Sequence, residues 1–568
     1  MNSSMKVADI IEAYNTGTRK EYDIFLSKLA YSQIESSKLV LYLRELRECI
    51  SLLDKDHEIL VGLLLKVDWP DRETKVVKEY QLFFLNLMSA HTSYLQAGLK
   101  MIVKHFWAKC DKKHKPDKES RMKDSLRFGN VHKILSAVVK IVPMTPTLLI
   151  PLLVKNFPFI MLHTYCQECY VRNLLEITKY IPQERKSILD IIVDRMINID
   201  VHASREDINA AEGNEEEEME EDSAIFDMDD SGLCEDGECS PKMSHEMANK
   251  LDVLMNIVLG YIQSECCPTG QLAWEATKKL YKEFLYVFDR TILPTTLNHV
   301  QFIMFYLCSF KQPICEGFID YLWKKFQDPN TQTIFRQSAV GYIGSLLSRA
   351  TFISVSTLKV VINLMVTWIH GYLDQASADA VQADITRHRP FYSACQAVFY
   401  VFCFRQKEIF EMKKGYKWAE SLNFQRIVTS RLNPLRVCLP IVVKTFASLT
   451  RMHQIAFCDT IIQKNERCML PMLAPSTSYS DSTEVSNLLD FFFPFDPYLL
   501  VRSRSYIAPF YREYSGSLQL DEEKADTEEE DDFLPKETVP DVPIPDFTSG
   551  KSTTDFMQYG VSPGFKNL

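Results

Sequence analysis

Glycine is scarce in this sequence. Only 18 of the 568 residues are glycine, about half of the ~7% that is usual in proteins. Few positions are therefore available for the tight turns and close backbone approaches that phosphate-binding loops and doubly wound α/β folds require. The shortage favours a fold made of helices joined by short turns.

Long apolar runs and a pattern of paired cysteines are missing as well. The longest apolar runs, residues 147–162 and 360–373, are interrupted by Lys155, Pro158 or His370. Neither reaches the ~18 apolar residues of a membrane-spanning helix, so no membrane partner is expected. The fifteen cysteines lie scattered through apolar stretches, and the first residues show no secretory leader. We therefore expect free thiols in a reducing compartment.

Motifs for catalysis and for metal binding are also absent. G-x-x-x-x-G-K-[ST], G-x-G-x-x-G, H-E-x-x-H and G-x-S-x-G do not occur, although enzymes use them to hold phosphates, dinucleotides, zinc or an activated serine. His163, Cys166 and Cys169 could supply three metal ligands, but no second Cys/His pair follows at zinc-site spacing. Buried thiols are the preferred interpretation. We predict that the protein is not an enzyme, needs no cofactor and holds no structural zinc.

Acidic charge is concentrated in two runs. Sixteen of the 33 residues in 206–238 are Asp or Glu, and residues 521–541 hold eleven carboxylates against two lysines. Such blocks bury too little apolar surface to offset their ordering entropy, so both are predicted to be disordered. The first run contributes a net charge of −16 and the second a net charge of −9. When both runs are left out, the net charge of the chain rises from −11 to +14. A basic folded part suits nucleic acid or an acidic protein surface, and we hypothesise that the acidic runs screen it against indiscriminate nucleic-acid binding.

Helical periodicity runs from residue 5 to about residue 465, apart from the first acidic run. Leu39, Leu43, Leu46, Ile50 and Leu53 recur at steps of four and three, which draws one apolar stripe on a helix. Prolines and short polar clusters follow at intervals of about 10 to 20 residues, so we expect many helices of that length.

The pattern repeats. An offset of 40 residues relates Leu148, Leu149, Leu152, Leu153 and Phe157 to Ile188, Leu189, Ile192, Val193 and Ile197. An offset of 43 relates Phe318, Ile319, Leu322, Trp323 and Phe326 to Val361, Ile362, Met365, Val366 and Ile369. Both lie within the ~40 to 47 residues of HEAT and armadillo repeats, whose helix pairs bury their stripes against neighbouring pairs. The alternative is chance alignment of amphipathic helices. We predict an all-α HEAT-repeat (armadillo-like) superhelix with a long disordered acidic insert and a disordered acidic C-terminal tail.

Five regions follow from this pattern. They are N-terminal repeats over 1–203, the acidic insert over 204–244, C-terminal repeats over 245–475, an aromatic segment over 476–520 and the acidic tail over 521–568. Residues 491–500 contain five aromatics, which indicate either a docking element or, preferably, a segment packed back on the repeats. Gly341 and Gly344 have the spacing of a nucleic-acid-binding GXXG loop, but close helix packing explains them better.

Three basic groups are candidate interaction surfaces, although charged runs usually form solvated faces. The first is a loop between Lys109 and Lys123, the second spans 413–436, and the third is the Arg-Ser-Arg-Ser of 502–505. Ser120 and Ser125 flank Arg121 in the first group, where a phosphate would subtract about two charges and weaken binding of an acidic partner. Ser240 and Ser562 precede prolines and are further candidate phosphorylation sites.

Four runs resemble a known family. They are residues 306–310 (YLCSF), 317–326 (GFIDYLWKKF), 335–345 (FRQSAVGYIGS) and 432–438 (LNPLRVC). Together with the position of the acidic insert and the FPFDPY of 493–498, they are similar to the RNA polymerase I-specific transcription initiation factor IA (TIF-IA) family. The resemblance covers almost the whole chain.

The resemblance implies a non-enzymatic HEAT-repeat factor of the nucleus and nucleolus. Such a factor binds RNA polymerase I at its stalk side, bridges it to the promoter-bound selectivity factor for ribosomal RNA gene transcription, and is regulated by kinases. The polymerase-contact and phospho-regulated patch is then expected at Lys112, Lys113, Lys115, Ser120, Arg121 and Ser125. A surface for a second partner, or for a weak DNA contact, is expected at Lys413, Lys414, Lys417, Arg431 and Arg436. Family members carry a longer leader, so regulatory sites there are expected to be missing from this sequence.

Two other functions remain open from the residues alone. One is a nuclear transport receptor or another HEAT scaffold, although transport receptors usually have more repeats than 568 residues permit. The other is a direct nucleic-acid binder, whose DNA affinity would fall steeply with salt in the absence of polymerase.

Overall fold

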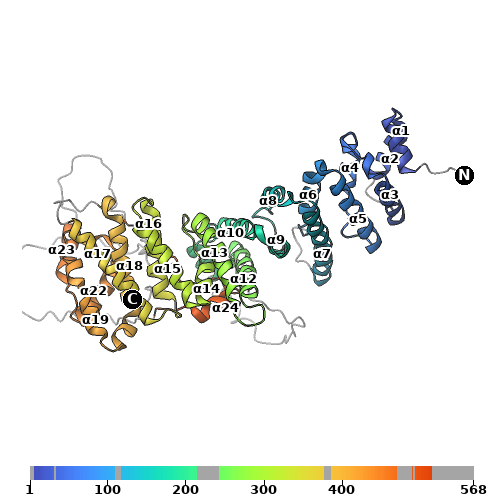
Figure 1. The fold of residues 1–568 in the computed structure, drawn as a ribbon. Coiled ribbons are helices and arrows are strands. Elements are labelled where there is room, and N and C mark those ends of the chain that lie inside the picture. Colours follow the sequence, from blue (N-terminus) through green and yellow to red (C-terminus); the bar gives the residue numbers. More distant parts are fainter. Residues whose placement is uncertain are drawn as a thin grey trace, which may run out of the picture. The chain divides into compact units, whose positions relative to one another are not determined.

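The computed structural model describes residues 6–30, 34–108, 117–213, 242–376, 385–469, 489 and 493–514. These residues form helices and turns and contain no strand, only one isolated antiparallel bridge between Ala350 and Tyr511. The predicted all-α fold class is therefore confirmed (Figure 1). No helix within the described ranges combines the length and the apolar character that crossing a membrane requires.

The chain divides into two compact units. Unit 1 comprises Met1–Leu307 and Leu499–Tyr506, and unit 2 comprises Cys308–Tyr498 and Ile507–Leu568. This division does not coincide with the one expected at the acidic insert. The insert was expected from residue 204, whereas the structure continues as a helix over 205–213, because Ile208 is buried and Ser204 accepts a hydrogen bond from the Asp207 amide. Residues 214–241 and 515–568 lie outside the described residues, so their disorder stays a prediction.

The helices of unit 1 follow one another closely along the chain. They are α1 (Val7–Asn15), α2 (Lys20–Ala30), α3 (Ser36–Glu48), η1 (Ile50–Leu52), η2 (Lys55–His57), α4 (Glu58–Leu64), α5 (Thr74–Ala90), η3 (Thr92–Tyr94), α6 (Leu95–Lys104), α7 (Lys118–Ile141), α8 (Thr145–Lys155), α9 (Thr164–Tyr180), η4 (Pro182–Glu184), α10 (Arg185–Asp200), α12 (Glu246–Cys266), α13 (Trp274–Val287), the π-helical η5 (Phe288–Ile292) and α14 (Phe302–Ser309), which ends at the start of unit 2.

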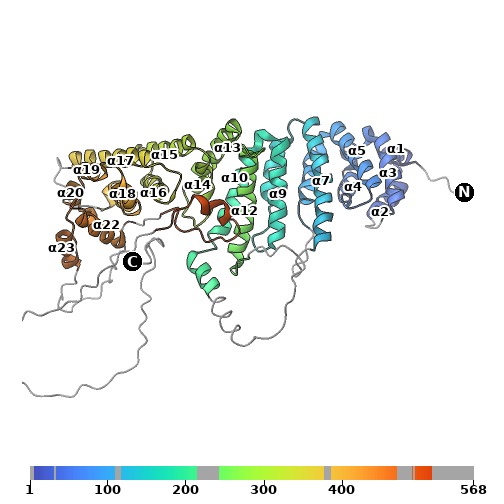
Figure 2. The same ribbon diagram turned by 90° about the horizontal axis from the view of Figure 1, so that it is seen from below.

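Alternate helices of unit 1 pack against each other. One row of contacts joins α1 to α3, α3 to α5, α5 to α7, α7 to α9 and α9 to α12, and a second row joins α2 to α4, α6 to α8 and α8 to α10. Figure 2 shows α7, α9 and α12 side by side. Two rows of alternating helices are the arrangement that stacked helical hairpins produce.

The apolar stripes read from the sequence form the core. The Leu39 to Leu53 stripe is buried, and so are the positions related by the offsets of 40 and 43 residues, except Leu148 and Phe157, which are half-buried. The first offset relates α8 to α10, which contact each other. Each fully buried Leu or Ile side chain contributes about 1.5–3 kcal/mol relative to exposure, so the stripes are the main stabilising feature of the stack.

Unit 2 is built around α16 and α18, which pack against each other. Its helices are α15 (Gln312–Gln327), α16 (Thr333–Arg349), α17 (Val355–Ala376), α18 (Ile385–Glu411), α19 (Gly415–Ser421), α20 (Phe424–Val428), α21 (Pro434–Val437), α22 (Pro440–Met452), α23 (Asp459–Met469), α24 (Arg504–Ile507), most of which belongs to unit 1, and η6 (Ala508–Phe510). α18 packs against α16, α17 and α22. A methyl group built on Gly344 would lie 2.9 Å from the Cβ of Ala397, so this glycine serves the close packing of α16 on α18.

The aromatic C-terminal segment contributes to the core of each unit. In unit 2, Phe493 stacks on Tyr400 with ring centroids 3.8 Å apart, and Phe495 meets Tyr342 edge-on at 5.6 Å. In unit 1, the buried carboxylate of Asp252 accepts hydrogen bonds from the Arg502 amide, the Ser503 amide and the Ser503 hydroxyl. Phe493 and Phe495 are therefore core residues rather than an exposed docking element. The third basic group, residues 502–505, is held in place through the backbone amides of Arg502 and Ser503.

Candidate interaction surface

A groove of about 670 Å³ runs between α7 and α9 in unit 1. Ser125, Gly129 and Ser136 line it from α7, and Glu168 and Arg172 line it from α9. Positions three, four and seven apart share one helix face, so α7 presents this row to the groove while its other face, including Val131 and Val138, is buried.

The start of α7 is fixed by a side-chain cap. Asp117 Oδ1 accepts a hydrogen bond from the Ser120 amide at 2.9 Å, as an N-cap carboxylate does. Hydrogen bonds from Ser120 also lower the pKa of the Asp117 carboxyl. Ser120 is exposed in the first turn of α7, where unpaired backbone amides favour negative charge. A phosphate at Ser120 would therefore be compatible with the helix while reducing the positive charge around it.

Arg121 is held on an aromatic face. Its guanidinium lies 5.3 Å from the ring centroid of Tyr165 on α9, and Tyr165 donates a hydrogen bond to Asp124 at 3.2 Å. Asp124 also forms an ion pair with the buried Arg127 at 3.2 Å. Burial raises the pKa of the Tyr165 hydroxyl above its ordinary value. Arg121 is exposed but pre-oriented, which reduces the side-chain entropy lost when it binds an anion.

The buried side chains in the walls of the groove are uncharged at neutral pH. His132 contacts the Tyr180 hydroxyl at 2.9 Å and the Asn173 side-chain oxygen at 3.1 Å, and burial lowers the pKa of its imidazole. Burial also raises the pKa of the Cys169 thiol to about 12. The groove thus has neutral walls and charged residues at its rim, an arrangement suited to binding a peptide rather than to acid/base catalysis.

The His-x-x-Cys-x-x-Cys run is part of the helix packing. His163 caps α9, its Nδ1 accepting a hydrogen bond from the Tyr165 amide at 3.1 Å. Cys166 and Cys169 are buried in a cluster with Ala108 and Tyr165. Within the described part of the chain, no three His, Cys, Asp or Glu side chains gather as metal ligands.

The structure places only some of the predicted site residues. Ser120, Arg121 and Ser125 share the first turns of α7, and all three are exposed. The other candidates of that patch, Lys112, Lys113 and Lys115, lie outside the described residues. The two serines that precede prolines, Ser240 and Ser562, lie outside them as well.

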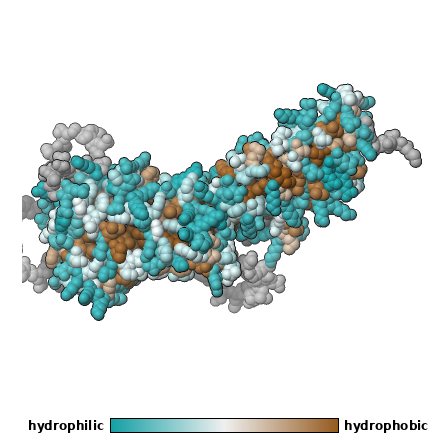
Figure 3. Space-filling model, viewed as in Figure 1, coloured by the Kyte–Doolittle hydropathy of each residue, from teal (hydrophilic) through white to brown (hydrophobic). Residues whose placement is uncertain are grey.

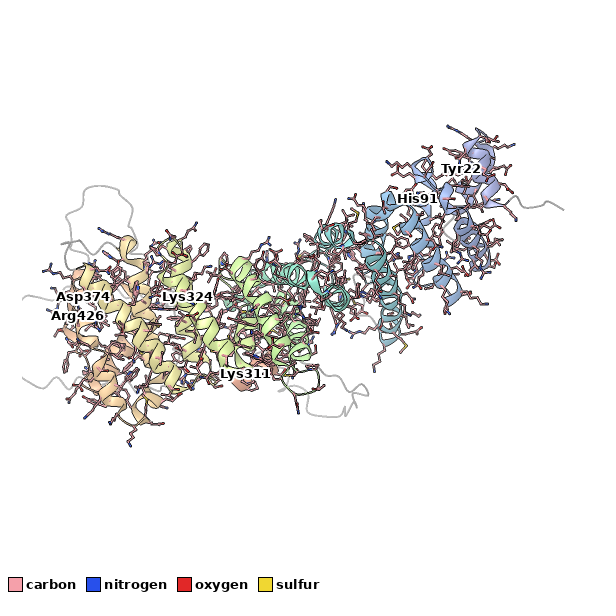
Figure 4. The ribbon with its side chains drawn as sticks, viewed as in Figure 1. Tyr22, His91, Lys311, Lys324, Asp374 and Arg426 are labelled. Carbon is pink, nitrogen blue, oxygen red and sulfur yellow. The ribbon has the colours of Figure 1, made fainter. Side chains whose placement is uncertain are left out.

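The second basic group lies on the short helices of unit 2. Its five members are exposed and form no ion pair among the described residues; Lys413 and Lys414 precede α19, Lys417 lies on it, Arg431 precedes α21 and Arg436 lies on it. Residues 421–458 contain five Lys or Arg and no Asp or Glu. Arg426 pairs with Asp374 of α17 (Figure 4), and Arg451 pairs with Asp459 at 3.7 Å.

Sequence reasoning missed an exposed apolar loop between α8 and α9. Phe159 is 67% exposed and Met161 is 64% exposed, and Figure 3 shows apolar surface around α8. The sequence offered no signal for this exposure, because both residues belong to an apolar run that resembles a buried stripe.

Comparisons with known proteins identify the family. The family model of the RNA polymerase I specific transcription initiation factor RRN3 matches residues 2–518. A mouse protein, RNA polymerase I-specific transcription initiation factor RRN3, is 38% identical over 98% of this chain and 88% of its own length. Caenorhabditis elegans tif-1A, described by the same phrase, is 24% identical over 81% of this chain and 73% of its own length.

A solved structure shares the fold. The crystal structure of RNA polymerase I transcription initiation factor Rrn3 aligns with a TM-score of 0.69 at 21% identity, covering 90% of this chain and 97% of the solved chain. With the match of the family model over residues 2–518 and the 38% identity to the mouse protein, this chain belongs to the RRN3/TIF-IA family of RNA polymerase I-specific transcription initiation factors.

Proposed function

We propose that this protein binds RNA polymerase I and bridges it to the promoter-bound selectivity factor, so that ribosomal RNA genes are transcribed. The observation that carries the proposal is membership of a family named for initiation by this polymerase, with 38% identity to the mouse protein over 98% of the chain. A nuclear, and within it nucleolar, location follows from that role. The same membership disfavours a nuclear transport receptor or an unrelated HEAT scaffold.

The mechanism is recruitment rather than chemistry. One surface holds the polymerase and another holds a promoter-bound partner, which converts the second binding event into an intramolecular one at an effective concentration that can reach the millimolar range. Packed helices with fixed side chains suit this task, because a rigid surface loses little entropy on binding. No catalytic group takes part.

We place the polymerase contact on the first turns of α7. Arg121 is exposed and pre-oriented on Tyr165, and Ser125 lines the groove beside it. An acidic polymerase surface would pair with Arg121 and with the basic residues that precede α7. Phosphate on Ser120 or Ser125 would oppose the same contact, so kinases would regulate the association.

Capture of purified RNA polymerase I tests this placement. Arg121→Glu and Ser125→Asp should each weaken capture about tenfold, because each places a like charge opposite an acidic partner. Ser125→Ala should bind as the unchanged chain does. Lys324→Glu is the matched control, since Lys324 is exposed on α15 in unit 2 (Figure 4). Equal capture by all four variants would refute the placement of the polymerase contact on α7.

A second candidate activity is direct DNA binding by the basic group of unit 2. Arg431, Arg436 and Lys444 are exposed within the stretch that lacks acidic residues. If they contact phosphates, reversing all three should reduce the slope of log affinity against log salt by roughly 0.9 per lost contact. DNA binding without polymerase, measured by fluorescence anisotropy over a salt series, checks this. An unchanged slope would show that these three residues do not contact DNA phosphates, and they would then remain candidates for contact with the second protein partner.

A further inference from the structure

The groove between α7 and α9 has an apolar floor. Phe128 of α7 packs against a buried cluster that includes Tyr165 and Cys169 of α9, and all three side chains line the groove. Asn173 and Tyr180 add polar groups to the same lining. A mostly apolar lining with a few polar groups is usual for a site that binds a ligand of moderate size.

A glycine that the packing of the fold does not require keeps the groove open. Gly129 lies inside α7 and lines the groove, and a methyl group built on it would meet no atom within 4 Å. Glycine destabilises a helix interior relative to alanine. The close approach of Ala397 explains Gly344, whereas at Gly129 the space that a side chain would take adjoins the groove. This glycine therefore serves the groove rather than the core.

The carboxylates at the α9 rim are already paired. Arg172 donates a hydrogen bond to Glu168 at 3.0 Å, and Lys179 forms an ion pair with Glu176 at 2.6 Å. Each pair lies within α9 itself. The α9 rim is therefore neutral overall.

The α7 rim carries two cations in excess. Arg121 and Lys133 both line the groove, and neither forms an ion pair with a carboxylate in the part of the chain that the structure describes. Twelve positions separate them, about 18 Å along the helix axis. A ligand complementary to the groove therefore carries two carboxylates at about this spacing, with an apolar side chain between them.

The size of the groove favours an extended ligand over a helix. A helix of about 18 Å has about twelve residues and a diameter of about 10 Å, so it occupies roughly 1,400 Å³. The groove holds about 670 Å³. An extended chain covers the same distance in about six residues, and its side chains alternate between two sides. Carboxylates at the first and seventh positions then share one side, and the fourth side chain points to the other.

We propose that the groove between α7 and α9 binds an extended acidic segment of a partner protein. Two carboxylates about six residues apart pair with Arg121 and Lys133, and an apolar side chain between them packs on Phe128 and Cys169. That the partner is RNA polymerase I rests on the proposed function; the binding of the acidic segment by the groove does not.

A fluorescein-labelled heptapeptide of sequence ETTFTTE tests this recognition, because its threonines favour an extended chain. Measured by fluorescence anisotropy at low salt, it should bind the full chain about tenfold more tightly than ETTSTTE, which lacks the ring, or KTTFTTK, which reverses both charges. A helical peptide with two glutamates twelve positions apart and a central phenylalanine should bind more weakly than ETTFTTE. Equal binding of the three heptapeptides, or tighter binding of the helical peptide, would overturn the proposal.

A variant that fills the groove locates the contact. Gly129→Leu places a side chain in open space and should weaken binding of ETTFTTE about tenfold or more. Gly371→Leu is the matched control, since Gly371 lies inside α17 of unit 2 and also meets no atom within 4 Å. Leucine favours the helix at both positions, so both variants should fold, and a circular dichroism melt verifies this. Undiminished binding to Gly129→Leu would refute the placement.

Charge reversal tests the two cations separately from the floor. Arg121→Glu combined with Lys133→Glu should weaken binding of ETTFTTE and strengthen binding of KTTFTTK, because both partners then exchange sign. Both residues are exposed, so the change leaves the core intact. If the double variant kept the preference for ETTFTTE, the carboxylates would not pair with these two residues.

Polymerase capture separates this proposal from the proposed function. If both hold, Gly129→Leu should weaken capture of polymerase I about tenfold, and excess ETTFTTE should compete with polymerase for the unchanged chain. If the peptide experiments succeed and Gly129→Leu captures polymerase as before, the acidic-segment site stands and the polymerase contact at α7 fails. If Arg121→Glu weakens capture but ETTFTTE binds no better than its controls, the polymerase contact stands and the acidic-segment site is wrong.

Discussion

The close approach of α16 and α18 at Gly344 gives a quantitative prediction. Gly344→Ala would place a methyl carbon 2.9 Å from the Cβ and 3.2 Å from the Cα of Ala397, whereas carbon atoms prefer ~3.5–4.0 Å. Neither of these atoms belongs to a flexible side chain, so the helices must separate. Overpacking of this kind costs about 1–3 kcal/mol, and replacing a helical glycine by alanine returns about 1 kcal/mol. We expect unit 2 to lose about 1 kcal/mol of unfolding free energy.

Two variants isolate the contact from the helix propensity. Gly371→Ala in α17 meets no atom within 4 Å, so it should stabilise unit 2 by up to about 1 kcal/mol. Adding Ala397→Gly to Gly344→Ala removes the 2.9 Å contact with the Cβ and leaves the 3.2 Å approach to the Cα, so the double-mutant cycle should report a partial relief, a coupling of about 1 kcal/mol. Guanidinium unfolding, with hydrogen exchange of α16 and α18 to assign the transition, measures both. If Gly344→Ala stabilises unit 2 as much as Gly371→Ala does, the close-packing argument is wrong.

Three further predictions concern buried contacts. Asp252→Ala leaves the Ser503 hydroxyl and two backbone amides without their acceptor, at a cost of about 1–3 kcal/mol, and hydrogen exchange of residues 500–506 should accelerate while that of α5 stays unchanged. Phe493→Ala removes a buried ring stacked on Tyr400 and should cost about 3–5 kcal/mol, seen as a lower denaturation midpoint; a shift below 1 kcal/mol would contradict its role in the core. Burial lowers the pKa of His57, so unit 1 should be most stable above its unfolded pKa of ~6.5 and lose stability as the pH falls below it. His57→Gln should flatten the melting temperature between pH 7 and pH 5, and an unchanged slope would assign the pH dependence to other groups.

Local pattern was sufficient to predict the helices and their stripes. Residues such as Leu39, Leu43 and Leu46 recur at helical spacing. An apolar stripe of this kind is buried by packing against a neighbouring helix. Repeats amplify this signal, because the same stripe returns every 40 or 43 residues. The close packing of Gly344 was also predictable, since a glycine within a helical pattern has few other roles.

Contacts between distant parts of the chain were not predictable. Arg502 and Arg504 looked like a basic surface, yet Asp252, 250 residues earlier, holds the backbone at Arg502 and Ser503. Phe159 looked like a buried residue of an apolar run, yet the loop is held with this side chain outward by Gln167 and Lys250. In both cases the outcome depends on a partner that the local pattern does not contain.

The surface charge of the folded part is smaller than the sequence arithmetic indicates. The side chains of Arg127, Arg349, Arg405 and Lys250 are at most 2% exposed, so their charges lie inside the two units. Other cations face carboxylates, as Arg185 does with Glu265 and Glu283. The +14 obtained by setting the acidic runs aside therefore does not describe a uniformly basic surface that would attract any nucleic acid.

Among the exposed cations of the described residues, two groups are the candidate contacts. Arg121 marks the start of α7 in unit 1, and Arg431, Arg436 and Lys444 mark the short helices of unit 2. Three phosphate contacts would give a slope of log affinity against log salt of only about −3, which is too shallow for the electrostatic term alone to support tight DNA binding. Under the proposed function, specific protein contacts, in which exposed apolar side chains such as Phe159 add to a few charges, would account better for the choice of one polymerase, because discrimination among partners requires more than charge of one sign.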